Sequence, residues 1–284
     1  MGARPLEFED VNGLSPEEWL AQLKAHGSEG AGTSLIYPGF PDEEVQKQFV
    51  GSAFDDALDE GYNFYTHVAS LMGEPSYQAS LARRYLDFGC GWGRIGRFFL
   101  RDFQRGEMSG VDIDASMVDF CARSQVPGAF FQIFNGRPLP FGANSFRLIT
   151  AYSVFTHLPP HLFRAWMDEL LRVLAPGGLL VFTVEPPRFL DFIESVDPEK
   201  SENTWHAGLA DHKKDMPALR ATLELDGIAH LPTGGGDCRT PDVYGETVVT
   251  HQYVAQTVRP HGKVASAVDD PGRFWQAGYG VRKT

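Results

Sequence analysis

The stretch YLDFGCGWGRIGRFFL, residues 85–100, joins an apolar run to a helix-like run through a turn rich in glycine. Two glycine spacings overlap in it. The letters GWGRIG, from Gly91, give GxGxxG, and GCGWG, from Gly89, gives GxGxG two residues after Asp87. Ligands of open α/β sheets bind at the carboxyl ends of the strands, which is where a strand–turn–helix sequence places these glycines. The stretch therefore predicts a ligand-binding turn, and the two spacings leave the ligand open.

Strands and helices alternate on both sides of this turn. Apolar runs predict strands, and amphipathic runs between them predict helices. Such alternation gives right-handed crossovers and a parallel sheet covered on both faces, an α/β fold. The predicted strands are 84–88, 107–113, 129–134, 146–155 and 179–185, and the predicted helices are 94–103, 115–124 and 159–174, the last ended by Ala-Pro-Gly-Gly.

The segments before and after this core have different patterns. Residues 1–80 read as a helical leader or lid, with helices over 16–26 and 41–72, which Gly51 and Gly61 could interrupt, and with GSEGAGTS as a linker between them. Residues 81–284 form the main domain. Within it, 186–246 lose the alternation and read as an insertion on the substrate side, with one helix near 217–225. A last helix over 250–258 and a strand pair, 262–268 and 274–284, complete the chain.

The composition argues against several classes of binding partner. A formal net charge of −12 argues against a nucleic-acid partner and against binding to an anionic membrane surface. No apolar run has transmembrane length, and the acidic N-terminus is unlike a secretory signal, so a cytoplasmic protein is expected. Three scattered cysteines form no metal-binding pattern, and no metal is expected.

The acidic residues near the turn indicate which ligand it binds. Asp112 follows the second strand at the distance expected of an acid that binds ribose hydroxyls, and it suits either glycine spacing. Asp87 distinguishes between the two kinds of ligand, because a carboxylate beside the turn would repel a pyrophosphate but attract an ammonium group. A nicotinamide dinucleotide is therefore the weaker alternative.

Four motifs in order, DFGCGWG, GVDID, LPFGANSFRLITAYSVFTHL and LLRVLAPGGLLVFTV, resemble those of the class I S-adenosylmethionine (SAM) methyltransferases over about residues 82–185. The resemblance implies a Rossmann-like fold with a mostly parallel seven-stranded sheet and an insertion after the fifth strand. The leader FVGSAFDDALDEGYNFY, the turn GCGWGRI and the strand exit SVFTHL are similar to those of a bacterial subgroup acting in sugar, glycan and natural-product pathways.

The resemblance also assigns cofactor residues. Asp87 would orient the methionine ammonium group, Asp112 would accept both ribose hydroxyls, and Ile113 would pack on the adenine. The usual adenine-binding Asp is replaced by an Asn, whose amide oxygen can accept the same hydrogen bond. The full expected set is Asp87, Gly89, Cys90, Gly91, Asp112, Ile113, Asn135, Gly136 and Ser153.

Residues on the acceptor side are less defined by the sequence. His157 follows the fourth strand and is a candidate general base, because an unperturbed imidazole titrates near neutral pH. The alternative is that it hydrogen-bonds the backbone and shapes the turn. Glu185 and His251 are further candidates, as a base, a substrate ligand or a solvated side chain. Tyr62 and Tyr65 of the leader are expected to pack in the core.

The expected function is transfer of a methyl group from SAM to a small-molecule or sugar acceptor, at oxygen, with S-adenosyl-L-homocysteine as product. Methylation of an amine or a protein side chain, and a SAM-binding module without catalysis, remain alternatives. The sequence does not identify the acceptor. It also leaves open whether the insertion is a lid or a contact of a homodimer.

Overall fold

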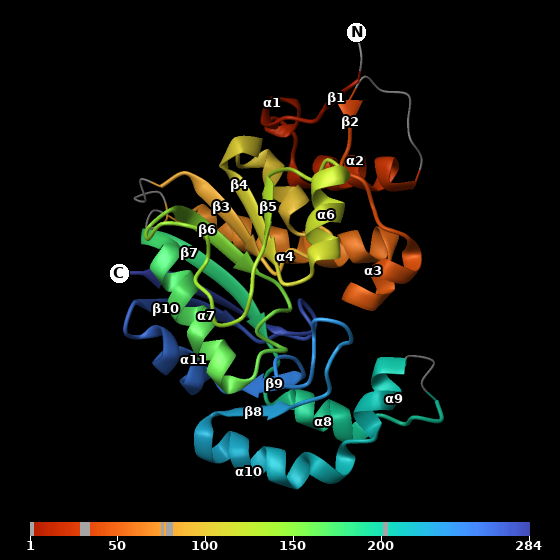
Figure 1. Cartoon of the computed structure of the whole chain (residues 1–284), viewed down its shortest axis with the longest axis vertical. Helices are drawn as coiled ribbons and strands as arrows, with labels where there is room; N and C mark the ends of the chain where they lie inside the picture. Colours follow the sequence, from red (N-terminus) through yellow and green to blue (C-terminus); the bar gives the residue numbers. More distant parts are fainter. Residues whose placement is uncertain (1–2, 29–34, 75–76, 78–81, 201–203) are drawn as a thin grey trace. The chain divides into compact units, whose positions relative to one another are not determined.

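The computed structural model describes residues 3–28, 35–74, 77, 82–200 and 204–284 (Figure 1). Its central element is a seven-stranded, mostly parallel sheet with strand order β10-β11-β7-β6-β3-β4-β5. The pairs β3–β4, β3–β6 and β4–β5 are parallel. The predicted α/β fold, the Rossmann-like fold of class I methyltransferases, is confirmed.

The strands of the sheet lie close to their predicted positions. They are β3 (Arg84–Phe88), β4 (Met108–Asp112), β5 (Ala129–Gln132), β6 (Phe146–Ala151), β7 (Leu174–Val184), β10 (Gly262–Val268) and β11 (Ala277–Lys283). Strand β6 ends earlier than predicted. Strand β7 begins earlier, so that the Ala-Pro-Gly-Gly run lies inside the strand instead of before it. Pairing within a sheet can extend a strand over residues of low strand propensity.

Most predicted helices are present. They are α2 (Pro16–Ser28), α3 (Glu43–Val50), α4 (Phe54–Met72), α6 (Ala115–Arg123), α7 (Pro160–Val173), α10 (Met216–Asp226) and α11 (His251–Val258). Gly51 ends α3 in a left-handed conformation, whereas Gly61 lies within α4 without interrupting it. Residues 29–34 of the predicted linker lie outside the described residues.

One predicted helix has a different form. The segment after the glycine turn was expected to be an α-helix over 94–103, but η1 (Gly96–Arg101) is a 3-10 helix. Its hydrogen bonds span three residues, as from Phe98 N to the Ile95 carbonyl at 3.1 Å. Phe98, Phe99 and Leu100 are all fully buried. The amphipathic pattern predicted a helix here but could not distinguish a 3-10 helix from an α-helix.

The chain divides into two compact units: unit 1 comprises residues 1–152, 170–181 and 283, and unit 2 comprises 153–169, 182–282 and 284. The leader belongs to unit 1. Its core contains Trp19 and Tyr65, and the Trp19 indole N–H donates to the Phe98 carbonyl at 3.2 Å. Tyr65, as expected, is fully buried, whereas Tyr62 is partly buried against the same core.

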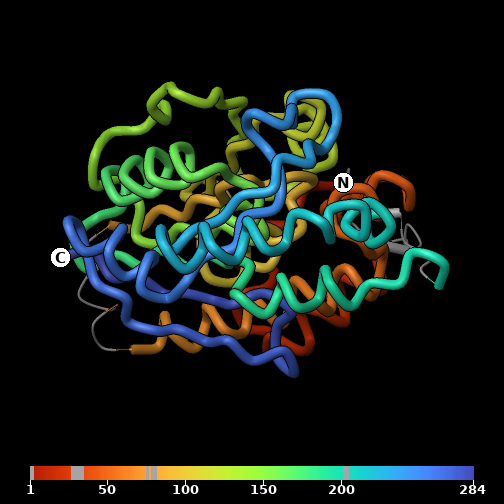
Figure 2. Tube along the Cα trace, turned by 90° about the horizontal axis from the view of Figure 1, so that it is seen from below, coloured from red at the N-terminus to blue at the C-terminus, as the bar shows by residue number. Residues whose placement is uncertain are grey.

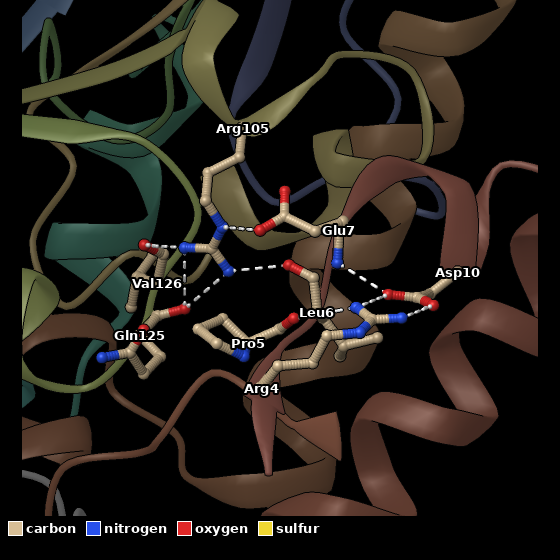
Figure 3. A network of polar contacts seen from close by, with 8 residues as sticks. All are labelled: Arg4, Pro5, Leu6, Glu7, Asp10, Arg105, Gln125 and Val126. Atoms are coloured by element: carbon tan, nitrogen blue, oxygen red, sulfur yellow. Dashed lines mark hydrogen bonds and ion pairs between the residues drawn. The ribbon is translucent and has the colours of Figure 1, made fainter. Parts of the chain in front are cut away.

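Polar contacts also hold the start of the leader within unit 1 (Figure 3). Two short strands, β1 (Arg4–Pro5) and β2 (Leu35–Ile36), pair there, and α1 (Phe8–Val11) follows β1. The Arg105 guanidinium, from η2 (Arg105–Glu107), donates to the Leu6 carbonyl at 2.9 Å and to the Val126 carbonyl at 3.3 Å. These bonds connect the leader to the loop that precedes β5.

The insertion of unit 2 has more regular structure than the sequence predicted. Besides α10, it contains α8 (Arg188–Ser195), α9 (Thr204–Ala210), η3 (Lys213–Asp215) and the antiparallel pair β8 (Ile228–Leu231) and β9 (Glu246–Val249); its path can be followed in Figure 2. Phe189, Leu190, Ile193, Leu209 and Met216 form its buried core. Among the described residues, no helix is both long and apolar enough to cross a membrane.

Candidate functional site

The glycine turn of unit 1 contacts the end of the neighbouring strand. Gly91 N donates to Asp112 Oδ2 at 2.8 Å, and Asp114 N donates to Asp112 Oδ1 at 2.9 Å. Each carboxylate oxygen can accept a further hydrogen bond, so Asp112 can also receive two hydroxyl groups from a ligand. The half-buried Asp112 is therefore fixed in place by the backbone before any ligand binds.

A side chain at Gly91 would not clash with the rest of the protein. Its φ is +47°, and an added Cβ atom would meet only Phe49, at 3.7 Å. Gly93 differs, because a Cβ there would lie 2.5 Å from Val126 Cγ1. Close packing explains the glycine at Gly93, whereas at Gly91 packing does not require a glycine. The open position next to Asp112 leaves room for a ligand to approach the backbone.

Asp87 lies beneath the turn and is only 3% exposed. Its Oδ2 accepts from Gly96 N at 2.9 Å, and its Oδ1 accepts from Thr150 Oγ1 at 3.2 Å. Burial raises the pKa of Asp87 to about 7, although these two hydrogen bonds act in the opposite direction. Both oxygens thus have protein partners, an arrangement that holds the turn in shape.

The other expected cofactor residues of unit 1 surround this edge. Cys90 is buried, and its side-chain hydrogen bond with Cys121, followed by burial, raises the pKa of its thiol. Ile113 is half-buried, directly after β4. Asn135 and Gly136 lie in the turn after β5, where Gly136 has a φ of +76° and open space around it. The parallel register of β3, β4 and β5 brings these residues to the same edge of the sheet.

Arg94 was not predicted to have a role at this edge. It is 5% exposed, and its guanidinium donates to Glu60 Oε2 at 2.7 Å and to the Ala57 carbonyl at 3.3 Å. Its charge acts to lower the pKa of Asp87. The only signal in the sequence was its position next to the glycine turn, because its partners come from α4, about 35 residues earlier in the chain.

Ser153, which follows β6, belongs to unit 2. It adopts a φ of +57°, which is uncommon for a residue other than glycine. Its N–H donates to Thr183 Oγ1 at 2.7 Å, and its hydroxyl accepts from Gln276 Nε2 at 2.9 Å. Contacts from two distant segments therefore hold the turn after β6.

His157 also has defined partners in unit 2. Its Nδ1 lies 2.8 Å from the Gly245 carbonyl, and its ring stacks on Tyr244 with a centroid distance of 4.3 Å. Burial lowers the pKa of His157 to about 4. A neutral imidazole that donates to a backbone carbonyl matches the turn-shaping role that the sequence left open for it.

Glu185 and His251 lie in different surroundings. His251 is exposed at the start of α11, and its ring stacks on Tyr279 with a centroid distance of 5.7 Å. Glu185 is 3% exposed at the end of β7. Near it lies the buried Glu246, which the sequence analysis did not select because its position in the insertion carries no motif.

The fold agrees with comparisons to known proteins. Residues 86–178 match the family described as a methyltransferase domain. A solved SAM-dependent methyltransferase from Leishmania major superposes with a TM-score of 0.53 at 14% identity, covering 95% of this chain and 85% of that one. Another, from Clostridium acetobutylicum, gives 0.52 at 11% identity and covers 78% and 91%.

A curated relative is similar over part of its length. The fatty-acid O-methyltransferase of Mycolicibacterium smegmatis is 30% identical over 140 residues, which is 49% of this chain and 46% of the relative. This chain thus spans about half the length of that relative. The matched family segment includes the glycine turn, Asp112 and Asn135, but it ends before Glu185.

Proposed function

We propose that this protein is a SAM-dependent methyltransferase that transfers the methyl group to a small-molecule or sugar acceptor, at oxygen. The observation that carries the proposal is the hydrogen bond from Gly91 N to Asp112, at a glycine where an added Cβ atom would contact only Phe49 and clash with nothing. It leaves a carboxylate in position to accept ribose hydroxyls, next to a backbone that a ligand can approach. The methyltransferase-domain match over 86–178 supports the same ligand.

In this proposal Asp112 binds the ribose of SAM, Ile113 packs on the adenine, and Asn135 with Gly136 contacts the base. Asp87, Gly89, Cys90 and Gly91 form the turn that receives the methionine part. Ser153 and the candidate acceptor residues His157, Glu185 and His251 belong to unit 2. The half-buried, neutral His157 is the weakest of these as a base, because its pKa of about 4 lies far below neutral pH.

The reaction is an in-line displacement. The bond between the methyl carbon and the SAM sulfur breaks as the bond to the acceptor oxygen forms, S-adenosyl-L-homocysteine leaves, and the hydroxyl proton is lost. The sulfonium is already activated, so the protein acts mainly by aligning the reactants. The name of the fatty-acid O-methyltransferase relative supports oxygen as the methylated atom.

The test has two steps. Calorimetry with SAM first measures binding, with Gly91→Arg as a variant that fills the open space. SAM labelled on its methyl group is then incubated with the protein and with source-cell extracts fractionated into polysaccharide, lipid, small-molecule and protein pools. Label in a sugar or small-molecule pool, absent with Gly91→Arg, is the expected result. Absence of SAM binding would overturn the proposal, and label in the protein pool would indicate a protein-modifying enzyme.

A further inference from the structure

Two buried carboxyl groups lie together in unit 2. Glu185 follows β7 and pairs with Val248 of β9, and Val249 N donates to the Glu185 carbonyl at 3.0 Å. Glu246 is the first residue of β9, and its side chain lies on the same face of the strand as that of Val248. Glu185 and Glu246 are 3% and 4% exposed. We call them the carboxyl pair.

The partners of the carboxyl pair leave one oxygen without a hydrogen bond. Glu246 Oε1 accepts from the Trp205 indole N–H at 2.8 Å, and Gln276 hydrogen-bonds the Glu185 carboxyl group. Gln276 is itself held by the Ser153 hydroxyl. Within the part of the chain that the structure describes, the buried Glu185 Oε2 has no hydrogen-bond partner. A buried polar atom without a partner is rare and costs free energy unless a ligand satisfies it.

The charges around the pair do not neutralise it. His157 Nδ1 lies 3.8 Å from Glu246 Oε2, but its hydrogen bond goes to the Gly245 carbonyl and burial keeps the ring neutral. Arg188 acts to lower the pKa of Glu185, but its guanidinium forms an ion pair with Asp269 at 2.9 Å. Asp269 acts to raise the same pKa. Within the described part of the chain, neither carboxyl group forms an ion pair with a lysine or arginine.

The pair consequently retains a proton near neutral pH. Burial, followed by the charge of Glu246, raises the pKa of Glu185 to about 8. Burial raises the pKa of Glu246 to about 7, against the hydrogen bond from Trp205. A cation that enters the site can replace this proton, since it neutralises the same two groups.

A cluster of aromatic side chains reaches the carboxyl pair through Trp205. Trp205 packs on Phe189 and Phe192 with centroid distances of 6.1 and 6.2 Å, and Phe192 contacts Trp275 at 4.9 Å. Trp205 and Trp275 are 40% and 44% exposed, unusually open for such large apolar side chains. Aromatic faces attract organic cations, and they supply apolar contact for the carbon skeleton of a ligand.

We propose that the carboxyl pair binds an ammonium group of the acceptor, with Trp205 and its aromatic neighbours against the attached carbon skeleton. This inference rests on the proposed function, since it takes the ligand of unit 2 to be the acceptor. An N–H of the ligand donates to Glu185 Oε2, and the proton of the pair is released to solvent. An acceptor bearing a carboxylate at this position is disfavoured by charge repulsion.

Three probes of similar shape test the charge. Benzylamine is a cation, benzyl alcohol is neutral and benzoate is an anion at pH 8. Ligand-observed NMR measures the binding of each to the full chain without SAM. Benzylamine should bind more tightly than the other two by about tenfold or more. Its affinity should rise from pH 6 to pH 8 as the carboxyl pair loses its proton.

Isosteric variants test the residues. Glu185→Gln should weaken benzylamine binding by about tenfold and leave benzyl alcohol unchanged. Glu246→Gln should act in the same direction. Glu194→Gln is the matched control, since Glu194 is a half-exposed carboxyl group on α8 that pairs with Arg220, and it should leave all three affinities unchanged. Thermal unfolding of each variant confirms that it is folded.

Equal binding of benzylamine and benzyl alcohol, tighter binding of benzoate, or no binding of benzylamine would overturn the inference. Calorimetry with SAM separates this result from the proposed function. A protein that binds SAM and transfers its methyl group but discriminates against benzylamine would keep the proposed function and lose the ammonium site. A protein that binds benzylamine but not SAM would keep the ammonium site and lose the proposed function.

Discussion

Asp87 of unit 1 and Glu185 of unit 2 are both buried carboxyl groups with a raised pKa, yet their surroundings differ. Both oxygens of Asp87 accept hydrogen bonds, from Gly96 N and Thr150 Oγ1, so the group helps to hold its own turn. Glu185 has one oxygen without a partner and a second carboxyl group beside it. A satisfied buried acid can serve the fold, whereas an unsatisfied acidic pair needs a proton or a ligand.

The largest expected effect tests the edge that contains Asp87. Gly91→Arg should weaken SAM binding by at least about 100-fold, because the new side chain occupies the open space next to Asp112. Gly51→Arg is the control, since Gly51 has a similar positive φ and open space but lies between α3 and α4. Calorimetry should show normal SAM binding for this control. Similar losses in both variants would attribute the effect to backbone strain.

Asp112→Asn should have the next largest effect. An amide has one acceptor oxygen where the carboxylate has two charged ones, so SAM affinity should fall by about tenfold or more. Asp114→Asn is the control, because Asp114 caps α6 through Ser116 N, and Asn caps a helix equally well. Unchanged SAM affinity in Asp112→Asn would show that Asp112 does not bind the ribose.

Glu185→Gln tests whether the ionised Glu185 carboxyl group is unsatisfied, and the quantity measured is the free energy of unfolding. The folded protein keeps the Glu185 proton up to pH about 8, whereas the unfolded chain releases it near the ordinary value of 4.5. The folded state therefore binds more protons between these pH values, and the free energy of unfolding falls as pH rises through this window. Gln cannot ionise, so above pH 8 the variant should be more stable than the parent by about 1 kcal/mol or more.

Denaturant unfolding at pH 5 and pH 9 measures this difference, which should be small at pH 5 because Glu185 is then protonated. Glu194→Gln should match the parent at both values, since Glu194 is half-exposed and ion-paired with Arg220. A Glu185→Gln variant that is less stable than the parent at pH 9 would mean that the ionised carboxyl group is satisfied after all.

Trp205→Phe should have the smallest effect. It removes the indole N–H that donates to Glu246 Oε1, so the pKa of Glu246 should rise further and stability at pH 8 should fall by about 1 kcal/mol. Trp275→Phe keeps that hydrogen bond and is the control. Unfolding of both variants at pH 5 and pH 8 gives the comparison. A loss of equal size at both pH values would indicate packing instead of charge.

The part of the structure that the sequence predicted is local. The strand, glycine turn and acid at residues 84–93 and 107–112 lie within about 30 residues, and each element has its own pattern of apolar and glycine positions. The amphipathic pattern likewise located α6, which begins directly after Asp114. The 3-10 form of η1 was not predictable, because the pattern of apolar residues does not distinguish it from an α-helix.

The carboxyl pair shows what the sequence could not predict. Glu185 was recognised as a strand exit, but Glu246, Trp205 and Gln276 lie 61, 20 and 91 residues from it along the chain and belong to no motif. The bridge between Glu185 and Val248 brings β7 and β9, and with them the two acids, together. Their burial, and the raised pKa of each acid, depends on elements packed from outside the local segment.

The sequence by itself therefore determined the α/β alternation, the glycine turn and the acids Asp87 and Asp112 at the ends of β3 and β4, because local spacing and residue type are enough to define them. The tertiary structure decided which of the acids are satisfied. Asp87 gains Thr150 from the neighbouring strand, whereas Glu185 gains a second carboxyl group from β9. Hydrogen-bond satisfaction and desolvation depend on which distant segments meet, and that information appears only when the chain is folded.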